Sequence, residues 1–159
     1  MPRLIPTILA ALVFVPGCLQ AKTSIFDQNS WEVVYDPDAA PLRAACVVKT
    51  YQPRGIFELT MFDDQLDLSF ILLSNHTMQR ETNSPFRIQV DEFPVLDLHG
   101  ERYTLMVHTD DIDIQLIDQI ARGKVLKVDV NADDRWDVKI PLEHAFPALK
   151  SLATCYKDL

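Results

Sequence analysis

Apolar and polar residues alternate with a period of two along much of the chain from Trp31 onward, which is typical of β-strands with one buried face. In the clearest example, Phe86, Ile88 and Val90 fall on one face and polar residues fall on the other. Residues that favour turns separate such stretches, as at 52–55 and 63–65. The pattern predicts strands at 31–35, 45–50, 56–61, 66–73, 86–90, 102–108, 124–130 and 136–140, with a polar loop at 75–85.

The period then changes to that of an α-helix. The apolar stripe consists of Ile112, Leu116, Ile117 and Ile120. We expect Thr109 or Asp110 to cap this helix, and Asp111 and Asp113 to favour its positive end. Gly123 is expected just past its last turn, as the C′ residue.

A second helical pattern, at Ala145, Ala148, Leu149 and Leu152, predicts a short C-terminal helix with Pro147 tolerated in its first turn. Strands that follow one another closely, joined by short turns, favour antiparallel pairing. We therefore predict a mainly β fold, an antiparallel β-sandwich or barrel, with one mid-chain helix and a short C-terminal helix. Residues 31–159 are expected to form a single β-rich domain, preceded by a short N-terminal segment at 22–30.

The first 21 residues look like a signal peptide. Their apolar run at 5–15 is too short for a transmembrane helix, which needs about 20 residues. Residues 15–18 resemble a bacterial lipobox, so cleavage after Gly17 would leave Cys18 as the lipidated first residue of an outer-membrane lipoprotein. Cleavage after Ala21 would instead release a soluble periplasmic or secreted protein, and an uncleaved core helix is the third alternative.

Removal of this leader leaves two cysteines, Cys46 and Cys155, near the two ends of the domain. An even number of cysteines in an exported chain favours a disulfide, and therefore an oxidising compartment. The alternative is a pair of buried free thiols.

The chain carries a formal net charge of −8, which disfavours binding to nucleic acid. The same charge keeps a protein soluble, and it also attracts cationic partners. Two tryptophans are candidate partner contacts, Trp31 and Trp136, although burial of both beneath the sheet is the favoured explanation.

Candidate sites for metals or catalysis have simpler structural explanations. The segment at 129–134 begins like a calcium loop but has Asp134 where an EF-hand needs glycine, so we expect a hairpin turn. The four histidines share no metal-ligand spacing, and no nucleophile elbow is present; they are His76, His99, His108 and His144. The three aspartates at 110, 111 and 113 are expected to cap the helix rather than to hold a cation. We expect no catalytic residue, cofactor or metal.

Several of these features together resemble the invasion-associated locus B family of periplasmic β-sandwich proteins. The matching parts are Trp31, Cys46, the helix end at 120–124, and the segment from Ala145 through Cys155. The resemblance implies an exported protein with a non-enzymatic role near the cell envelope.

The sequence thus favours an exported cell-envelope binding or accessory protein without catalytic activity, whose partner is another envelope or extracellular protein. Membrane contact is expected only through a lipid on Cys18. Two alternatives remain: an acidic inhibitor or immunity protein for a basic lytic enzyme such as a lysozyme, and a small periplasmic hydrolase.

Overall fold

The computed structural model describes residues 22–40, 43–63, 65–73, 80–103, 106–110 and 112–157. These residues form one antiparallel sheet of ten strands and two helices, α1 (Ile114–Arg122) and α2 (Ala145–Lys157). The strands are β1 (Thr23–Gln28), β2 (Trp31–Ala40), β3 (Arg43–Gln52), β4 (Gly55–Met61), β5 (Leu66–Leu72), β6 (Glu81–Val90), β7 (Leu96–Arg102), β8 (Met106–Thr109), β9 (Val125–Asp129) and β10 (Val138–Pro141). The predicted mainly β, antiparallel fold with a mid-chain and a C-terminal helix is confirmed, and the sheet is not closed into a barrel.

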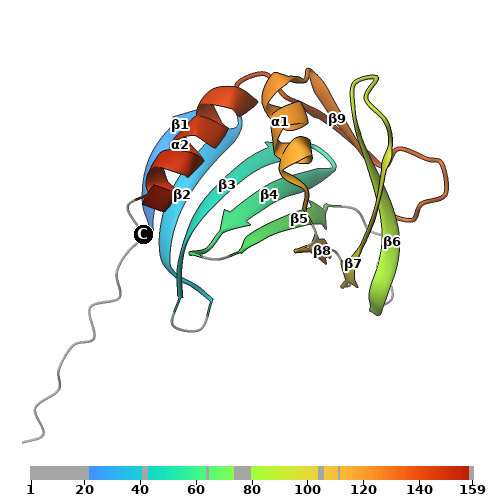
Figure 1. The fold of residues 1–159 in the computed structure, drawn as a ribbon, viewed down its shortest axis with the longest axis horizontal. Coiled ribbons are helices and arrows are strands. Elements are labelled where there is room, and N and C mark those ends of the chain that lie inside the picture. Colours follow the sequence, from blue (N-terminus) through green and yellow to red (C-terminus); the bar gives the residue numbers. More distant parts are fainter. Residues whose placement is uncertain are drawn as a thin grey trace, which may run out of the picture.

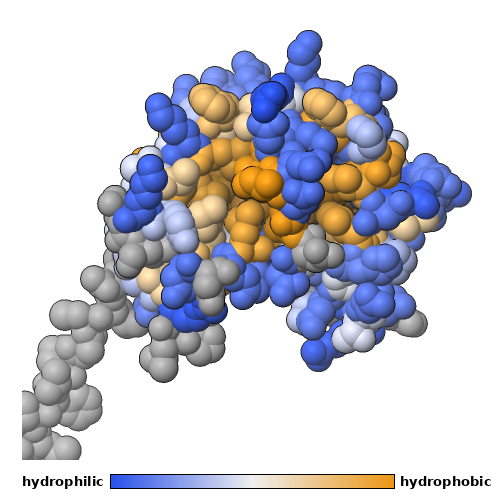
Figure 2. All heavy atoms as spheres, viewed as in Figure 1, coloured by the Kyte–Doolittle hydropathy of each residue, from blue (hydrophilic) through white to orange (hydrophobic). Residues whose placement is uncertain are grey.

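The sheet has the strand order β1-β2-β3-β4-β5-β8-β7-β6-β9-β10. It bends strongly, so that β1–β5 form one half and β6 and β9 lie in the other (Figure 1). Helix α2 packs against β1, β2 and β3, and α1 packs beside α2. Apolar side chains gather in the space between the two halves, with polar side chains around them (Figure 2). One curved sheet and two helices thus enclose a common core.

Four aromatic rings run through this core from one half of the sheet to the other. The ring centroids of Trp31 and Phe57 lie 6.0 Å apart, those of Phe57 and Phe70 5.4 Å, and those of Phe70 and Phe86 6.4 Å. Each of the four side chains is at most 2% exposed. Tilted and edge-to-face pairs at these separations add to the stabilisation from burial. The four rings therefore link β2, β4, β5 and β6.

Several strands differ from the sequence-based prediction. Strand β1 occupies the segment at 22–30, where no element was predicted, and β7 was also missed. Strand β6 begins at Glu81, inside the predicted polar loop, because its first residues pair with β7 through an irregular register rather than face the core. The predicted strand at 102–108 is divided between β7 and β8, and β10 begins two residues later than expected. Strand β1 is mostly exposed and has no regular apolar alternation, whereas β7 has only a short alternation at Leu96 and Leu98 before the polar residues that follow.

The ends of α1 also differ from expectation. Asp113, rather than Thr109 or Asp110, is the N-cap, and its carboxylate accepts the Gln115 backbone N–H at 2.9 Å. Gly123 does end the helix, but its φ of −76° is not the left-handed conformation of a C′ glycine. A Cβ at Gly123 would overlap the Val90 side chain and lie 2.9 Å from the Gln119 carbonyl oxygen. Close packing, rather than a left-handed backbone, therefore explains why position 123 is a glycine.

Gly123→Ala is expected to lower the free energy of unfolding by about 1–3 kcal/mol, because the added methyl group overpacks a full site. Thermal unfolding measures the effect. In combination with Val90→Ala, which removes the overlapping side chain, the two costs should be less than additive. Simple additivity would show that the loss at Gly123 does not come from this contact.

The predicted disulfide is present and joins Cys46 on β3 to Cys155 on α2, with their Cα atoms 6.0 Å apart and 109 positions apart in the sequence. Both cysteines are buried. The bond fastens the last helix to the sheet and indicates a location outside the reducing cytoplasm. In the described residues, neither helix is long and apolar enough to span a membrane. The leader and Cys18 lie outside the described residues.

Candidate functional site

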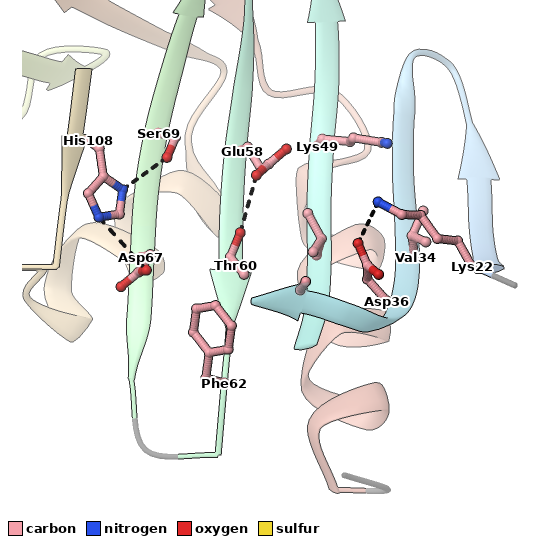
Figure 3. A pocket seen from close by; sticks show the side chains of 12 residues that line it. Lys22, Val34, Asp36, Lys49, Glu58, Thr60, Phe62, Asp67, Ser69 and His108 are labelled. Atoms are coloured by element: carbon pink, nitrogen blue, oxygen red, sulfur yellow. Dashed lines mark hydrogen bonds and ion pairs between the residues drawn. The ribbon is translucent and has the colours of Figure 1, made fainter. Parts of the chain in front are cut away.

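A pocket of about 340 Å³ lies on the outer face of the first half of the sheet, opposite the core; we call it the polar pocket. It is formed by strands β2, β3, β4, β5 and β8, together with Lys22 just before β1. Figure 3 shows its side chains projecting from these neighbouring strands toward a common space. Its charged and titratable side chains are Lys22, Asp36, Lys49, Glu58, Asp67 and His108.

The period of two builds this pocket. Along each strand the residues between the core positions point outward, and the pairing register aligns them across the sheet. Lys49 lies opposite Glu58, Glu58 opposite Ser69, and Ser69 opposite His108, so one row of polar residues crosses four strands. These positions are far apart in sequence, and only the register brings them together.

The floor of the polar pocket is apolar. Val34, Val47 and Phe62 lie on this outer face and are at most 8% exposed. Val47 and Phe62 belong to a small hydrophobic cluster separate from the main core. A hollow with an apolar floor and polar walls is typical of binding sites, in which burial supplies affinity and polar groups fix orientation.

In one wall of the pocket a serine, a histidine and an aspartate lie next to one another in space. Ser69 Oγ lies 3.1 Å from His108 Nδ1, and His108 Nε2 lies 3.8 Å from Asp67 Oδ2. A serine hydrolase also needs hydrogen-bond donors for the oxyanion. Ser69 lies within β5, whose backbone N–H groups point along the sheet toward β4 and β8 rather than into the pocket. Strand β5 itself therefore cannot supply a backbone oxyanion hole.

A second hollow, of about 460 Å³, lies between the β3–β4 turn and β10; we call it the Trp136 cleft. It contains Trp136, Asp137 and Arg54. Lys127 Nζ lies 5.8 Å from the centroid of the Trp136 ring, a cation–π contact. Trp136 is half-buried. The structure thus separates the two candidate contacts, because Trp31 is 1% exposed and belongs to the core.

Burial raises the pKa of Asp137 above its ordinary value, and nearby Asp129 and Asp133 raise it further. Two groups oppose the rise: the Val130 N–H, which donates to Asp137 Oδ2 at 2.9 Å, and the positive charge of Arg54. The folded protein therefore holds this proton to a higher pH than the unfolded chain does. It follows that stability falls as the pH rises from the ordinary pKa of an aspartate through the raised one.

Asp137→Asn is expected to abolish this loss of stability, because the amide keeps an oxygen acceptor for Val130 and never ionises. The gain in melting temperature over the unmodified protein should grow between pH 4 and pH 7. Glu92→Gln, a neutralisation at an exposed position, provides the matched control. A gain that is the same at both pH values would contradict the raised pKa.

The segment at 129–134 has a structural role. The buried Asp129 carboxylate accepts the backbone N–H groups of Asn131, Asp133 and Asp134, at 2.9–3.2 Å, and so shapes the turn between β9 and β10. The predicted hairpin is confirmed. In the part of the chain that the structure describes, no group of three or more His, Cys, Asp or Glu side chains could hold a metal ion. His76 and Asp111 lie outside the described residues.

Comparison with protein-family models, curated proteins and solved structures finds no match to this chain. Its function must therefore be argued from its own residues. Sequence reasoning placed no candidate contact in the polar pocket. Apolar residues at outward positions of β2 and β3, namely Val34, Ala45 and Val47, hinted at its floor, but the polar walls depend on the strand register.

Proposed function

We propose that this protein is an exported, non-catalytic binding protein of the cell envelope that engages another envelope or extracellular protein through the polar pocket. The observation that carries the proposal is the pocket itself, with an apolar floor and walls of charged side chains on a rigid sheet. The signal-like leader and the disulfide support export to the periplasm or beyond. This role agrees with the one implied by the resemblance to the invasion-associated locus B family.

Site-specific photo-crosslinking in the producing cells tests this proposal. Tyr51 is a suitable position for benzoylphenylalanine because it is aromatic, 46% exposed and next to Lys49 of the pocket, whose Nζ lies 5.6 Å from its ring centroid. Phe146 on α2 is the matched control, because it is also aromatic and is 61% exposed. We expect one discrete crosslinked envelope protein from position 51 that is absent from position 146. No product from position 51, or the same products from both positions, would overturn the proposal.

A further inference from the structure

We propose that the polar pocket binds the ammonium or guanidinium group of a lysine or arginine side chain presented by the protein partner, with Glu58 and Asp67 as the receiving carboxylates. This inference rests on the proposed binding function and specifies the chemistry that the partner must present. The same chemistry is compatible with the alternative role as an inhibitor of a basic enzyme, because such an enzyme displays many cationic side chains.

The lysines of the pocket already have carboxylate partners. Lys22 Nζ lies 2.5 Å from Asp36 Oδ2, and the Asp36 side chain is only 8% exposed. Lys49 Nζ lies 3.4 Å from Glu32 Oε2, at the edge of the pocket. These two ion pairs thus neutralise the two lysines of the pocket.

Glu58 and Asp67 have no such partner. Glu58 Oε1 accepts the Thr60 hydroxyl at 3.3 Å, and Asp67 Oδ1 accepts the Gln65 amide at 2.7 Å, both from neutral donors. Within the described ranges, no lysine or arginine nitrogen lies within 4.0 Å of either carboxylate; the nearest titratable donor is His108, at 3.8 Å from Asp67. Two negative charges in the same pocket thus lack a permanent counter-charge.

The geometry suits one cation between the two carboxylates. Glu58 and Thr60 project from β4, and Asp67 lies directly opposite Thr60 on β5 (Figure 3). Glu58 and Asp67 are therefore diagonal neighbours on one face of an antiparallel pair, with about 7–8 Å between such positions. The longer Glu58 side chain can turn toward the shorter Asp67 side chain, so that both carboxylates approach a single ammonium or guanidinium group; charge-assisted hydrogen bonds to such a group are the strong kind.

The apolar floor and the overall charge favour a protein side chain over a free inorganic cation. Val47 and Phe62 offer contact to the methylene groups of lysine or arginine, whose stems bind to apolar surfaces while their heads remain in polar surroundings. The net charge of −8 attracts a cationic protein over distance and speeds its association.

Four probes test the inference on the purified, disulfide-bonded protein: the Nα-acetyl methylamides of arginine, lysine and norleucine, and free cadaverine. Backbone amide shifts in the nuclear magnetic resonance spectrum should move in β4 and β5 on addition of the arginine or lysine probe, and much less with neutral norleucine. The affinity should fall as salt is added, because ionic screening weakens the attraction. Equal binding of norleucine would contradict the inference, and tighter binding of cadaverine would assign the pocket to small amines instead.

Glu58→Gln and Asp67→Asn should each weaken binding of the cationic probes at least about tenfold, because each removes a charged acceptor without changing its shape. Glu92→Gln, at an exposed position outside the pocket, should leave binding unchanged. Melting temperatures close to that of the parent would show that the pocket variants fold. If both pocket variants bind the probes as the parent does, while position 51 still crosslinks its partner, the inference is wrong and the binding function stands. Absence of the crosslink from the protein that carries benzoylphenylalanine at position 51 and no pocket substitution would instead refute the binding function.

Discussion

Removing the Cys46–Cys155 bond by replacing both cysteines with alanine is expected to lower the free energy of unfolding by about 4–5 kcal/mol. The bond closes a loop across 109 positions, and in the chain-entropy model a loop of about 100 residues contributes this much. Small domains have total stabilities of about 5–15 kcal/mol, so the loss is a large fraction of the whole. Urea unfolding monitored by circular dichroism measures it.

A reducing agent separates the effect of the bond from the effect of the substitutions. Dithiothreitol should destabilise the parent protein strongly and leave the double variant unchanged, because that variant has no bond to reduce. The bond fastens helix α2 to β3, and without it only packing holds the helix against β1, β2 and β3. We therefore expect hydrogen exchange to accelerate first in α2 when the bond is reduced. Equal stability of the parent with and without reductant would contradict this account.

Trp31→Ala is expected to cost about 3–5 kcal/mol, the usual range for removing a large aromatic side chain from a core. The Trp31 side chain is 1% exposed and packs edge-to-face against Phe57. Its loss would leave a cavity at the β2 end of the row of core rings. Chemical denaturation of the purified variant measures the cost.

Trp136 provides the matched comparison, because it is half-buried at the rim of a cleft. Trp136→Ala should cost clearly less than Trp31→Ala. In single-tryptophan proteins, acrylamide should quench the fluorescence of Trp136 well and that of Trp31 poorly. Comparable quenching of the two would show that Trp31 is not in the core.

The sequence-based prediction was accurate where one face of a strand is buried. Phe86, Ile88 and Val90 alternate because they point into the core, and all three are at most 1% exposed. Strand β1 has only Phe26 packed against the core, and its register shifts between Ser24 and Phe26, so it carries no regular pattern. The two missed strands are thus β1, at the sheet edge, and β7, where only Leu96 and Leu98 alternate and both are only partly buried.

The disulfide could be predicted because few pairings exist for so few cysteines. The polar pocket could not, because a row such as Lys49, Glu58, Ser69 and His108 exists only once the register of four strands is known. From the sequence these are ordinary outward-facing polar residues. Strand order was equally hidden, since β5 pairs with β8 and not with the next strand in the chain.

The mass of the protein recovered from the cell envelope after thiol blocking, without reduction, tests the central claim most directly. If the domain is exported and closed by one disulfide, the recovered chain lacks its leader. It also carries no blocking group on Cys46 or Cys155, because neither has a free thiol. The same measurement shows whether Cys18 has been removed or carries a lipid. A cytosolic protein that retains its leader and has both thiols blocked would contradict the account.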